Sequence, residues 1–281
     1  MLCIDPILKK VYALGILPVI KIEDASSAPA LAGALINGGL PAAEVTFRTA
    51  AAADAIRAMH ERFPDMLICA GTVLTPEQAK AAADAGASFI VSPGLNPKVV
   101  RYCLDHGIPV IPGCATPSDI EQAIELGLSA VKFFPAEANG GAAAIKAVSA
   151  PYPQMRFMPT GGVNLANLPA YLSNKKVLCC GGSFMVPGEA LAEGDYEKIT
   201  RLTAEAVRAV HGFTLRSLPV SGDEDLLSSL LPIEGTLPAV SVRSAARLSA
   251  YLSLMGISYT PCGENALTAF AAGQKILFVE A

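Results

Sequence analysis

A lysine lies inside an apolar stretch of the chain. The segment AVKFFPA, which begins at Ala130, places Lys132 between Val131 and Phe133. Loss of hydration at such a position disfavours the charged ammonium. A neutral amine can attack a carbonyl carbon and form a Schiff base. The alternative interpretation is a lysine at a strand end whose ammonium reaches solvent or pairs with a carboxylate.

A carboxylate occupies a similar position nearer the N-terminus. Glu44 lies in AAEVTF, an otherwise apolar segment, and Arg48 follows four residues later. A buried carboxylate is costly without a partner, and burial favours the protonated form that a proton shuttle needs. The forked donors of Arg48 could bind the carboxylate of a substrate. The two side chains could instead simply pair with each other.

Small polar residues and glycines follow several other apolar segments. Thr72 ends CAGTV, and a Ser92–Gly94 turn that contains Pro93 ends the next segment. Two glycine pairs come later, in Thr160–Gly162 and in Gly181–Ser183. Paired glycines let backbone N–H groups approach a ligand closely, so these two loops predict a phosphate site. Taken singly, Thr72 and the Ser92–Gly94 turn are also explained by ordinary turn chemistry.

Eight apolar segments recur through the first 212 residues and must position these side chains. Their centres are 20 to 26 residues apart, which leaves room for one strand, one helix and two short loops. Continuous apolar runs bounded by Gly and Pro are typical of parallel strands buried on both faces. The segments are LPVIKIE from Leu17, AAEVTF from Ala42, MLICAGTV from Met66, SFIVSPG from Ser88, PVIPGCA from Pro109, AVKFFPA from Ala130, MRFMPTGG from Met155 and VLCCGGSFMV from Val177.

The stretches between these segments carry helix signals. Ala28–Asn37 ends at a Gly pair, and Thr75 and Thr116 are each followed by Pro, as at a helix start. Asp195–His211 is the last expected helix. Eight strand–helix units predict an α/β fold of the (β/α)8 (TIM) barrel type, with its chemistry at the C-terminal ends of the strands. The alternative is an open doubly wound sheet, for which the expected GxGxxG motif is absent after the first segment.

Composition excludes several classes of protein. The 281 residues are 52% hydrophobic and 16% charged, which excludes a disordered chain, and no apolar run is long enough for a membrane helix. The net charge of −4 argues against a nucleic-acid surface. His60, His106 and His211 are not grouped with other metal ligands, so no metal is expected. The odd count of seven Cys residues and the lack of a signal peptide favour free thiols in the cytoplasm.

Six segments together resemble the family of 2-keto-3-deoxy-6-phosphogluconate (KDPG) and 4-hydroxy-2-oxoglutarate (KHG) aldolases. The resemblance covers roughly residues 5–211, and VKFFPAEANGG is its most specific part. It implies a class I, metal-free and cofactor-free aldolase on a (β/α)8 barrel, usually a homotrimer. The segments are EVTFRT (44–49), AGTVLTPEQ (70–78), SPGLN (92–96), VKFFPAEANGG (131–141), PTGGV (159–163) and GGSFMVP (181–187).

The resemblance also implies roles for individual residues. Lys132 would form the Schiff base, and Glu44 would act as the general acid and base, through a water. Arg48 and Thr72 would hold the pyruvate-derived carboxylate in a pocket shaped by Pro93. Apart from the resemblance, the position of Glu137 and Asn139 beyond the Lys132 segment indicates that they form the loop or support the site. The remaining implied substrate contacts are Phe134, beside the keto acid, and Thr160, Gly161, Gly162 and Ser183, at the phosphate.

The implied reaction is the reversible cleavage of KDPG to pyruvate and glyceraldehyde 3-phosphate. Cleavage of 4-hydroxy-2-oxoglutarate, and a preference for the C4 epimer derived from galactonate, stay open. Two other classes also remain: a phosphate-binding barrel isomerase or synthase, and a protein that binds a keto acid or sugar phosphate without catalysis. The isomerase or synthase would not need both a buried lysine in the sixth strand and a Glu–Arg pair in the second, and the binding protein would bind pyruvate without forming a reducible imine.

Residues 213–281 lie beyond the barrel (1–212) and beyond the usual end of the family. Leu237–Val242 and Lys275–Glu280 are predicted strands, and Arg243–Met255 is a predicted amphipathic helix. This β–α–β pattern weakly resembles one module of the vicinal oxygen chelate superfamily, but Glu280 alone is placed as a metal ligand, so no metal site is expected. We expect a small α+β extension of unknown role, which packs on the barrel or on a neighbouring subunit or carries a regulatory site.

Overall fold

The computed structural model describes residues 6–216, 239–271 and 274–280. The chain divides into two compact units, Met1–Val207 and Arg208–Ala281. Cys3 and the first two residues of the expected strand Leu237–Val242 lie outside the described residues. Among the helices that the structure describes, none is both long and apolar enough to cross a membrane.

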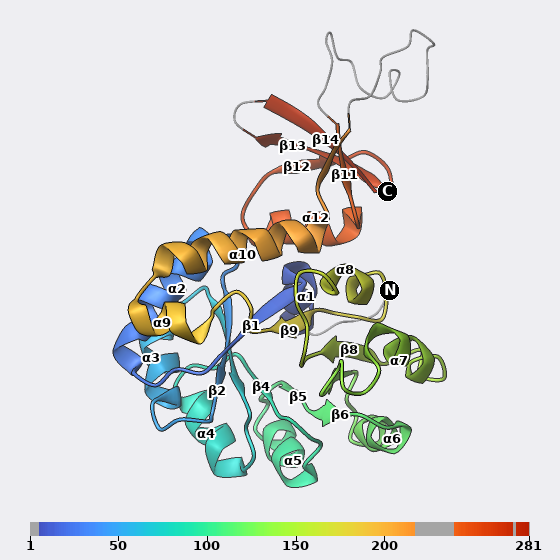
Figure 1. Ribbon diagram of the computed structural model, residues 1–281. Coiled ribbons are helices and arrows are strands. Elements are labelled where there is room, and N and C mark those ends of the chain that lie inside the picture. Colours follow the sequence, from blue (N-terminus) through green and yellow to red (C-terminus); the bar gives the residue numbers. More distant parts are fainter. Residues whose placement is uncertain (1–5, 217–238, 272–273, 281) are drawn as a thin grey trace, which may run out of the picture. The chain divides into compact units, whose positions relative to one another are not determined.

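Short parallel strands form the centre of the first unit, and helices surround them (Figure 1). Each predicted apolar segment contains a strand, so this part of the prediction is confirmed. The strands are β1 Ile16–Ile20, β2 Ala42–Thr46, β3 Leu67–Gly71, β4 Phe89–Val91, β5 Val110–Ile111, β6 Gly113–Cys114, β7 Ala130–Phe133, β8 Arg156–Pro159 and β9 Cys180–Gly182.

Helices alternate with these strands along the chain. The last expected helix, Asp195–His211, is preceded by a short helix that the sequence did not predict, α9. The helices are α1 Pro6–Leu14, η1 (3-10) Ala25–Ser27, α2 Ala28–Asn37, α3 Ala52–Arg62, α4 Pro76–Asp84, α5 Pro97–Asp105, α6 Pro117–Glu125, α7 Gly141–Val148, α8 Leu168–Leu172, α9 Gly188–Glu193 and α10 Tyr196–His211.

The strand pairings are those of a TIM-barrel-like fold. One sheet runs in the order β5-β4-β3-β2-β1-β9, and a second runs β6-β7-β8. The last strand, β9, therefore lies beside the first, and an isolated bridge between Thr160 and Gly181 connects the end of β8 to β9. An open doubly wound sheet does not bring its last strand beside its first in this way, so that alternative is wrong.

The fifth predicted strand is interrupted at Pro112. Its two halves are β5 and β6, and they pair with different neighbours: β5 with β4, and β6 with β7. Proline has no backbone N–H to donate to a strand ladder, so a break at this residue is expected on physical grounds. The prediction of one continuous strand here was wrong in detail, although the segment occupies the expected place.

Local helix signals position the ends of the helices as the sequence indicated. Thr75 Oγ1 accepts a hydrogen bond from the Gln78 N–H at the start of α4. Thr116 and Asp119 form a reciprocal capping box at the start of α6. These contacts satisfy backbone donors that the helix itself leaves unpaired. The predicted starts at Thr75 and Thr116, and the end of α2 at Gly38, are therefore confirmed.

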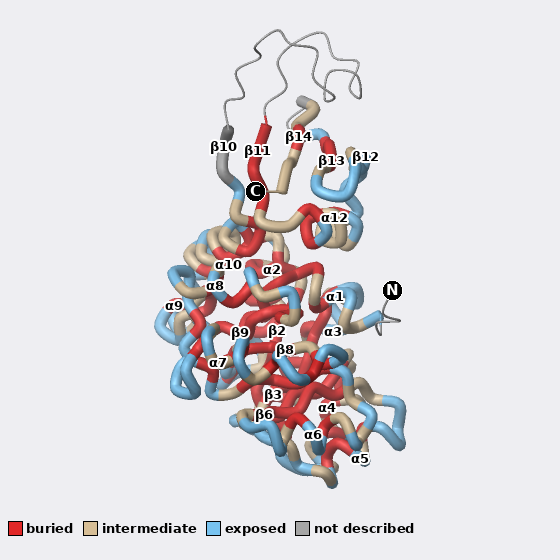
Figure 2. The backbone as a smooth tube through the Cα atoms, turned by 90° about the vertical axis from the view of Figure 1, so that its right-hand side faces the viewer, coloured by how far each residue is buried: buried red, intermediate tan, exposed pale blue. Residues whose placement is uncertain are grey.

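Buried residues follow the strands and the inner faces of the helices (Figure 2). Five of the cysteines are buried and form no disulfide with another described residue: Cys69, Cys103, Cys114, Cys179 and Cys180. Burial raises the pKa of Cys103 to about 11 and, with a smaller effect of Asp119, that of Cys114 to about 12. Protonated, buried thiols behave as small apolar side chains, as the sequence indicated for most of the cysteines.

The second unit contains a five-stranded mixed sheet in the order β10-β11-β14-β13-β12. β11 and β14 are parallel, whereas β13 runs antiparallel to both of its neighbours. The strands β12 and β13 were not predicted, because small residues and a proline weaken their strand pattern. The elements are β10 Thr214–Arg216, β11 Ala239–Val242, α12 Ala245–Leu254, β12 Tyr259–Pro261, β13 Ala266–Ala271 and β14 Gln274–Glu280.

One face of this sheet packs against α12. The apolar cluster joins Val240 and Val242 of β11 to Leu248 and Leu252 of α12 and to Leu267 of β13. At the start of α12, the Ala245 N–H donates to Glu280 Oε2 at 2.9 Å. Glu280, considered above as a metal ligand, therefore caps a helix.

A histidine without hydrogen-bond partners is buried in the second unit. His211 is 2% exposed, and neither ring nitrogen has a partner among the described residues. Its ring lies between Phe213, at 5.3 Å, and Tyr251, at 4.6 Å, measured between ring centroids. Burial, followed by the positive charge of Arg247, lowers the pKa of His211 to about 3. His211 is therefore neutral at physiological pH.

This histidine should make the second unit sensitive to acid. Because the folded-state pKa lies below the ordinary value of 6.5, the unfolded state binds the proton more readily, and stability is lost as the pH falls below that value. We expect a loss of up to about 1.4 kcal/mol per pH unit. His211→Phe should remove this dependence. The check is hydrogen–deuterium exchange of α12 in the parent protein and in the variant at the same two pH values. An equal loss of protection in both proteins on acidification would contradict the expectation.

Candidate active site

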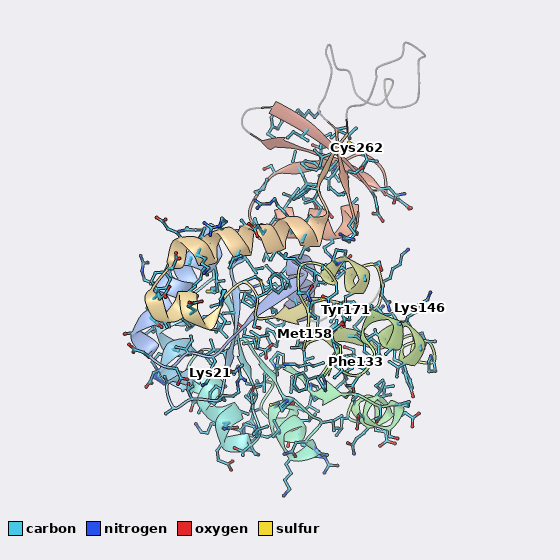
Figure 3. The ribbon with its side chains drawn as sticks, in the orientation of Figure 1. Lys21, Phe133, Lys146, Met158, Tyr171 and Cys262 are labelled. Atoms are coloured by element: carbon cyan, nitrogen blue, oxygen red, sulfur yellow. The ribbon has the colours of Figure 1, made fainter. Side chains whose placement is uncertain are left out.

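The ammonium of Lys132 and the carboxylate of Glu44 form a buried ion pair in the interior of the first unit. Lys132 Nζ donates to Glu44 Oε1 at 3.0 Å, and the side chains are 6% and 0% exposed. Lys132 lies on β7 and Glu44 on β2, 88 residues earlier. Met158, the register partner of Lys132 on β8, can be followed in Figure 3. A buried lysine at hydrogen-bond distance from a carboxylate has the geometry of a nucleophile beside its general base.

Part of this carboxylate is available to a further partner. Glu44 Oε2 is buried and has no hydrogen-bond partner among the described residues. Buried polar atoms in folded proteins nearly always have a partner, so an exception indicates a place for a ligand or a water. Thr160 Oγ1, after β8, is a second buried oxygen without a partner. Both oxygens belong to residues that were predicted from the sequence to form part of the site.

Two other side chains lie close to the ion pair. The ring of Phe134, just after β7, has its centroid 5.4 Å from Lys132 Nζ, at the range of a cation–π contact. Cys69, which the sequence did not select for the site, is the register partner of Glu44 on β3. Burial, followed by the charge of Glu44, raises the pKa of Cys69 well above its ordinary value. The thiol is therefore protonated and does not compete with Lys132 as a nucleophile.

Gly71 makes room for the carboxylate of Glu44. A Cβ atom at Gly71, the last residue of β3, would lie 2.3 Å from Glu44 Oε1 and 2.7 Å from Glu44 Cγ. Contacts this short require one of the groups to move. Gly71 is a positioning residue that the sequence did not single out, although it directly precedes Thr72 in AGTV.

We expect Gly71→Ala to lower kcat/KM of the reaction proposed below by about ten- to a hundredfold, because displacing a catalytic group by about 1 Å has effects of this size. The measurement is steady-state kinetics together with the melting temperature. Gly188→Ala is the matched control, since a Cβ at the first residue of α9 meets nothing within 4 Å. Unchanged kinetics in the Gly71 variant would show that Glu44 does not need this space.

Thr72 has a strained backbone. Its φ of 56° makes it the one residue other than glycine with positive φ among those that the structure describes. For a β-branched residue this conformation is a genuine outlier, and such strain is typical of functional sites. Thr72 follows β3, at the same end of the barrel as the other selected residues. The strain supports a functional role over ordinary turn chemistry.

Thr72→Gly should separate stability from binding. Glycine relieves the strain, but it also adds conformational entropy to the unfolded chain. We therefore expect the free energy of unfolding to stay unchanged or to rise by up to about 1 kcal/mol. The lost hydroxyl should raise KM by about tenfold if it binds substrate. Urea unfolding and kinetics measure the two effects. Thr75→Gly is the control, because Thr75 has an ordinary φ of −134°; a loss of stability in both variants would argue against strain at Thr72.

Three further predicted residues lie just beyond strand ends. Arg48 is exposed in the turn after β2, and its Nε donates to Thr46 Oγ1 at 3.3 Å. The sequence left open an ion pair between Glu44 and Arg48, and that alternative is wrong. Glu44 points inward to Lys132, whereas Arg48 lies in the turn beyond the strand. Pro93 follows β4, and Ser183 is exposed after β9. Among the described residues, no hydrogen bond or ion pair joins these three side chains to Lys132 or Glu44.

The Thr160–Gly162 loop needs its glycines. Gly161 and Gly162 have φ values of 101° and 81°, which side-chain-bearing residues rarely adopt. A Cβ at Gly181 would lie 2.4 Å from Thr160 Oγ1, so the second glycine pair lies directly beside the first loop. The two glycine loops are thus neighbours, as a shared phosphate site requires.

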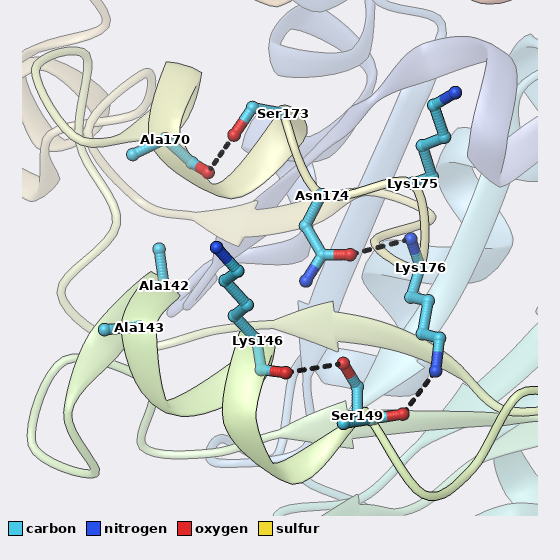
Figure 4. A pocket seen from close by; sticks show the side chains of 10 residues that line it. Ala142, Ala143, Lys146, Ser149, Ala170, Ser173, Asn174, Lys175 and Lys176 are labelled. Carbon is cyan, nitrogen blue, oxygen red and sulfur yellow. Dashed lines mark hydrogen bonds between the residues drawn. The ribbon is translucent and has the colours of Figure 1, made fainter.

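A separate pocket of about 520 Å³ lies on the outside of the first unit, between α7 and α8 (Figure 4). Its lining includes Lys146, Lys175 and Lys176, all near the C-terminal ends of the two helices. Lys176 Nζ donates to the carbonyl oxygens of Ser149 and, at 3.3 Å, Tyr152. Hydrogen bonds to the last carbonyl groups of a helix, and the favourable position of a positive charge there, explain lysines at these places structurally. Neither Lys132 nor Glu44 lines the pocket.

Among the residues that the structure describes, no group of three or more acids, histidines or cysteines is placed to hold a metal ion. The arrangement around Lys132 supplies an amine, a carboxylate and neighbouring polar loops.

Comparisons with known proteins point to one family. The family model described as KDPG and KHG aldolase matches residues 4–202. A 2-dehydro-3-deoxy-phosphogluconate aldolase of Treponema pallidum is 51% identical over 195 residues, which are 69% of this chain and 93% of that protein.

Solved structures agree with the sequence comparisons. A KDPG aldolase from Legionella pneumophila, with pyruvate captured as a covalent carbinolamine intermediate, is 41% identical with a TM-score of 0.69; the match covers 71% of this chain and 97% of that one. The 2-keto-3-deoxy-6-phosphogluconate aldolase of Zymomonas mobilis with 3-phosphoglycerate is 40% identical with a TM-score of 0.67 and covers 71% and 94%. The chain described here belongs to the KDPG and KHG aldolase family.

Proposed function

We propose that this chain is a class I aldolase that cleaves KDPG reversibly to pyruvate and glyceraldehyde 3-phosphate. The observation that carries the proposal is the buried contact of 3.0 Å between Lys132 Nζ and Glu44 Oε1, beside an unpartnered Glu44 Oε2. Family membership supports it, as do relatives that are named for this reaction and one captured with a covalent pyruvate adduct.

The first half of the reaction forms the iminium ion. Glu44 takes a proton from the Lys132 ammonium, the neutral amine attacks the C2 ketone, and Glu44 returns the proton to the carbinolamine hydroxyl, which leaves as water. Glu44 then accepts the proton of the C4 hydroxyl, directly or through a water. The C3–C4 bond breaks, its electron pair enters the iminium ion, and glyceraldehyde 3-phosphate and an enamine result. Protonation at C3 and hydrolysis release pyruvate and restore Lys132.

The other predicted residues are proposed to bind the substrate. Arg48 and Thr72 hold the carboxylate next to the ketone, with Pro93 shaping that pocket. Phe134 packs against the keto acid. The backbone N–H groups of the Gly161 and Gly162 loop, with Thr160 and Ser183, hold the phosphate, because donors on glycine backbone approach an anion closely. The unpartnered Thr160 Oγ1 supports this assignment.

Borohydride trapping tests the mechanism. Reduction in the presence of pyruvate should attach the keto acid covalently to Lys132, as read by peptide mass analysis. Label at any other lysine would contradict the assignment, and binding of pyruvate without a reducible imine would indicate a non-catalytic keto-acid binder. EDTA should leave activity unchanged; loss of activity that a divalent metal restores would indicate a class II aldolase.

The range of substrates is also proposed. The matched family includes KHG aldolases, so we expect 4-hydroxy-2-oxoglutarate to be cleaved to pyruvate and glyoxylate as well. The galactonate-derived epimer of KDPG is the alternative substrate. Side-by-side kcat/KM values for the three compounds decide the preference, and a higher value for the epimer than for KDPG would reassign the enzyme.

We propose that residues 1–212 form a complete (β/α)8 barrel and that residues 213–281 are a small α+β extension. The resemblance implies a homotrimer, and the five buried cysteines that form no disulfide among the described residues favour the cytoplasm, where thiols stay reduced. Truncation after His211 tests the extension: unchanged molecular mass by light scattering and unchanged kinetics would exclude roles in assembly and regulation.

A further inference from the structure

A tyrosine on the outer helix layer holds a carboxylate beside the second glycine of the Thr160–Gly162 loop. The Tyr171 hydroxyl on α8 donates to Glu137 Oε1 in the turn after β7. Tyr171 is 1% exposed, and its position can be followed in Figure 3. Burial, followed by the hydrogen bond and the charge of Glu137, raises the pKa of Tyr171. The phenol is therefore a proton donor at neutral pH, and its orientation is fixed by packing on α8.

The Glu137 side chain packs directly against Gly162. A Cβ at Gly162 would lie 2.5 Å from Glu137 Cγ and 2.7 Å from Glu137 Cβ. On its other side, a Cβ at Gly141, the first residue of α7, would lie 3.1 Å from Glu137 Oε1 and 3.5 Å from the Tyr171 hydroxyl. Glu137 is an exposed residue whose side chain contacts both glycines and lies near the start of a helix, where its charge is favourable.

The backbone joins the same two turns. The Glu137 N–H donates to the Gly161 carbonyl at 3.0 Å, and the Ala136 N–H donates to the Thr160 carbonyl at 2.8 Å. The turn after β7 therefore runs alongside the Thr160–Gly162 loop and contacts it through both main chain and side chain. Glu137 is therefore in a position to influence the conformation of the loop.

We propose that Glu137, held in place by Tyr171, is a positioning residue for the phosphate end of the substrate. It fixes the Gly161–Gly162 backbone so that its N–H groups converge on the phosphate, while touching neither the substrate nor Lys132. The inference rests on the proposed function, because it assigns the phosphate to this loop. On this proposal, the Tyr171–Glu137 contact affects the binding of phosphorylated substrates and does not affect the binding of unphosphorylated ones.

Tyr171→Phe is the direct test, because it removes the hydroxyl and keeps the buried ring. We expect KM for KDPG to rise about tenfold, as for the loss of a hydrogen bond to a charged group, with kcat little changed. The kinetic parameters for 4-hydroxy-2-oxoglutarate, which has no phosphate, should stay the same. A general structural defect would instead change the kinetic parameters for both substrates in parallel.

Two sets of variants serve as controls. Tyr152→Phe removes a comparable contact on the other side of α7, since the Tyr152 hydroxyl donates to Glu121 Oε1 at 3.0 Å, and it should leave both substrates unaffected. Glu137→Gln keeps an acceptor and the packing, so its KM for KDPG should stay within about twofold of the parent value. Glu137→Ala should reproduce the effect of Tyr171→Phe.

Three results would overturn the inference. These are an unchanged KM for KDPG in Tyr171→Phe, equal losses with both substrates, and a Glu137→Gln variant as impaired as Glu137→Ala. Borohydride trapping of pyruvate in the parent chain keeps this test separate from the proposed function. If Lys132 forms no imine there, the proposed function fails; if the imine forms but KM does not respond, the role of Glu137 fails alone.

Discussion

Lys132→Met is expected to lower kcat for KDPG cleavage by at least about 10⁴-fold, the scale found when a catalytic nucleophile is removed. Methionine has a similar length but no amine, so no Schiff base forms and the electrons of the C3–C4 bond have no acceptor. The strand pairing of β7 can remain, because the change affects only the end of the side chain, whereas the cation–π contact with Phe134 is lost with the ammonium. Rapid-quench turnover and borohydride trapping measure the loss.

This variant needs a control for the charge that it leaves behind. Glu44 is fully buried, and removing Lys132 takes away the counter-charge at 3.0 Å. A buried charge without its partner is strongly destabilising. The double variant Lys132→Met with Glu44→Gln removes both charges, and it should be folded and equally inactive. Lys146→Met, at an exposed position on α7, should keep full activity. Imine formation in either Lys132 variant would show that another lysine is the nucleophile.

Much of the barrel could be predicted from the sequence because its signals are local. Apolar runs bounded by Gly and Pro mark the strands, and the threonine caps at Thr75 and Thr116 depend on three or four consecutive residues. The break at Pro112 was in principle readable as well, since proline donates no hydrogen bond to either neighbouring strand. It was hidden because the surrounding residues are as apolar as those of an uninterrupted strand.

The contact between Lys132 and Glu44 could not be predicted in this way. Strands buried on both faces show no alternation of polar and apolar residues, so the sequence does not say which side chains point into the barrel. The contact depends on the relative register of β2 and β7, which are not paired with each other. The resemblance to a family placed both residues in one site, whereas composition and spacing left Glu44 equally compatible with an ion pair to Arg48.

The sequence did not single out Gly71, and it indicated Glu137 only as loop-forming or supporting, without the contacts that it makes. Gly71 matters because of a carboxylate on the neighbouring strand, and Glu137 matters because of Gly162 and a tyrosine 34 residues later. The left-handed φ of Thr72 is likewise imposed by its surroundings, since threonine by itself disfavours this conformation. In the second unit, β12 and β13 form through antiparallel pairing with β14, although their own residues give a weak strand pattern.

Glu44→Gln is expected to lower kcat by about 10²- to 10⁴-fold, the usual contribution of a general acid and base. Glutamine keeps the shape of the side chain and an oxygen that can accept the hydrogen bond from Lys132 Nζ. It cannot receive the proton of the C4 hydroxyl or deliver one to the carbinolamine. Steady-state kinetics and the rate of exchange of the pyruvate methyl protons into D₂O should fall together. Glu121→Gln, on α6, is the control and should leave both rates unchanged.

This variant also separates two roles that the structure permits for Glu44. If Glu44 served only as a counter-charge, its loss would favour the neutral form of Lys132, since an opposite charge stabilises the ammonium. Schiff-base formation with pyruvate would then be as fast as in the parent chain or faster. If Glu44 transfers protons, the same step must slow, because the carbinolamine hydroxyl leaves only when it is protonated. The unpartnered Glu44 Oε2 favours proton transfer, since it leaves an oxygen free for the substrate after the other has bound Lys132. The rate of imine trapping in Glu44→Gln therefore decides between the two roles, because only proton transfer by Glu44 predicts a lower rate than in the parent chain.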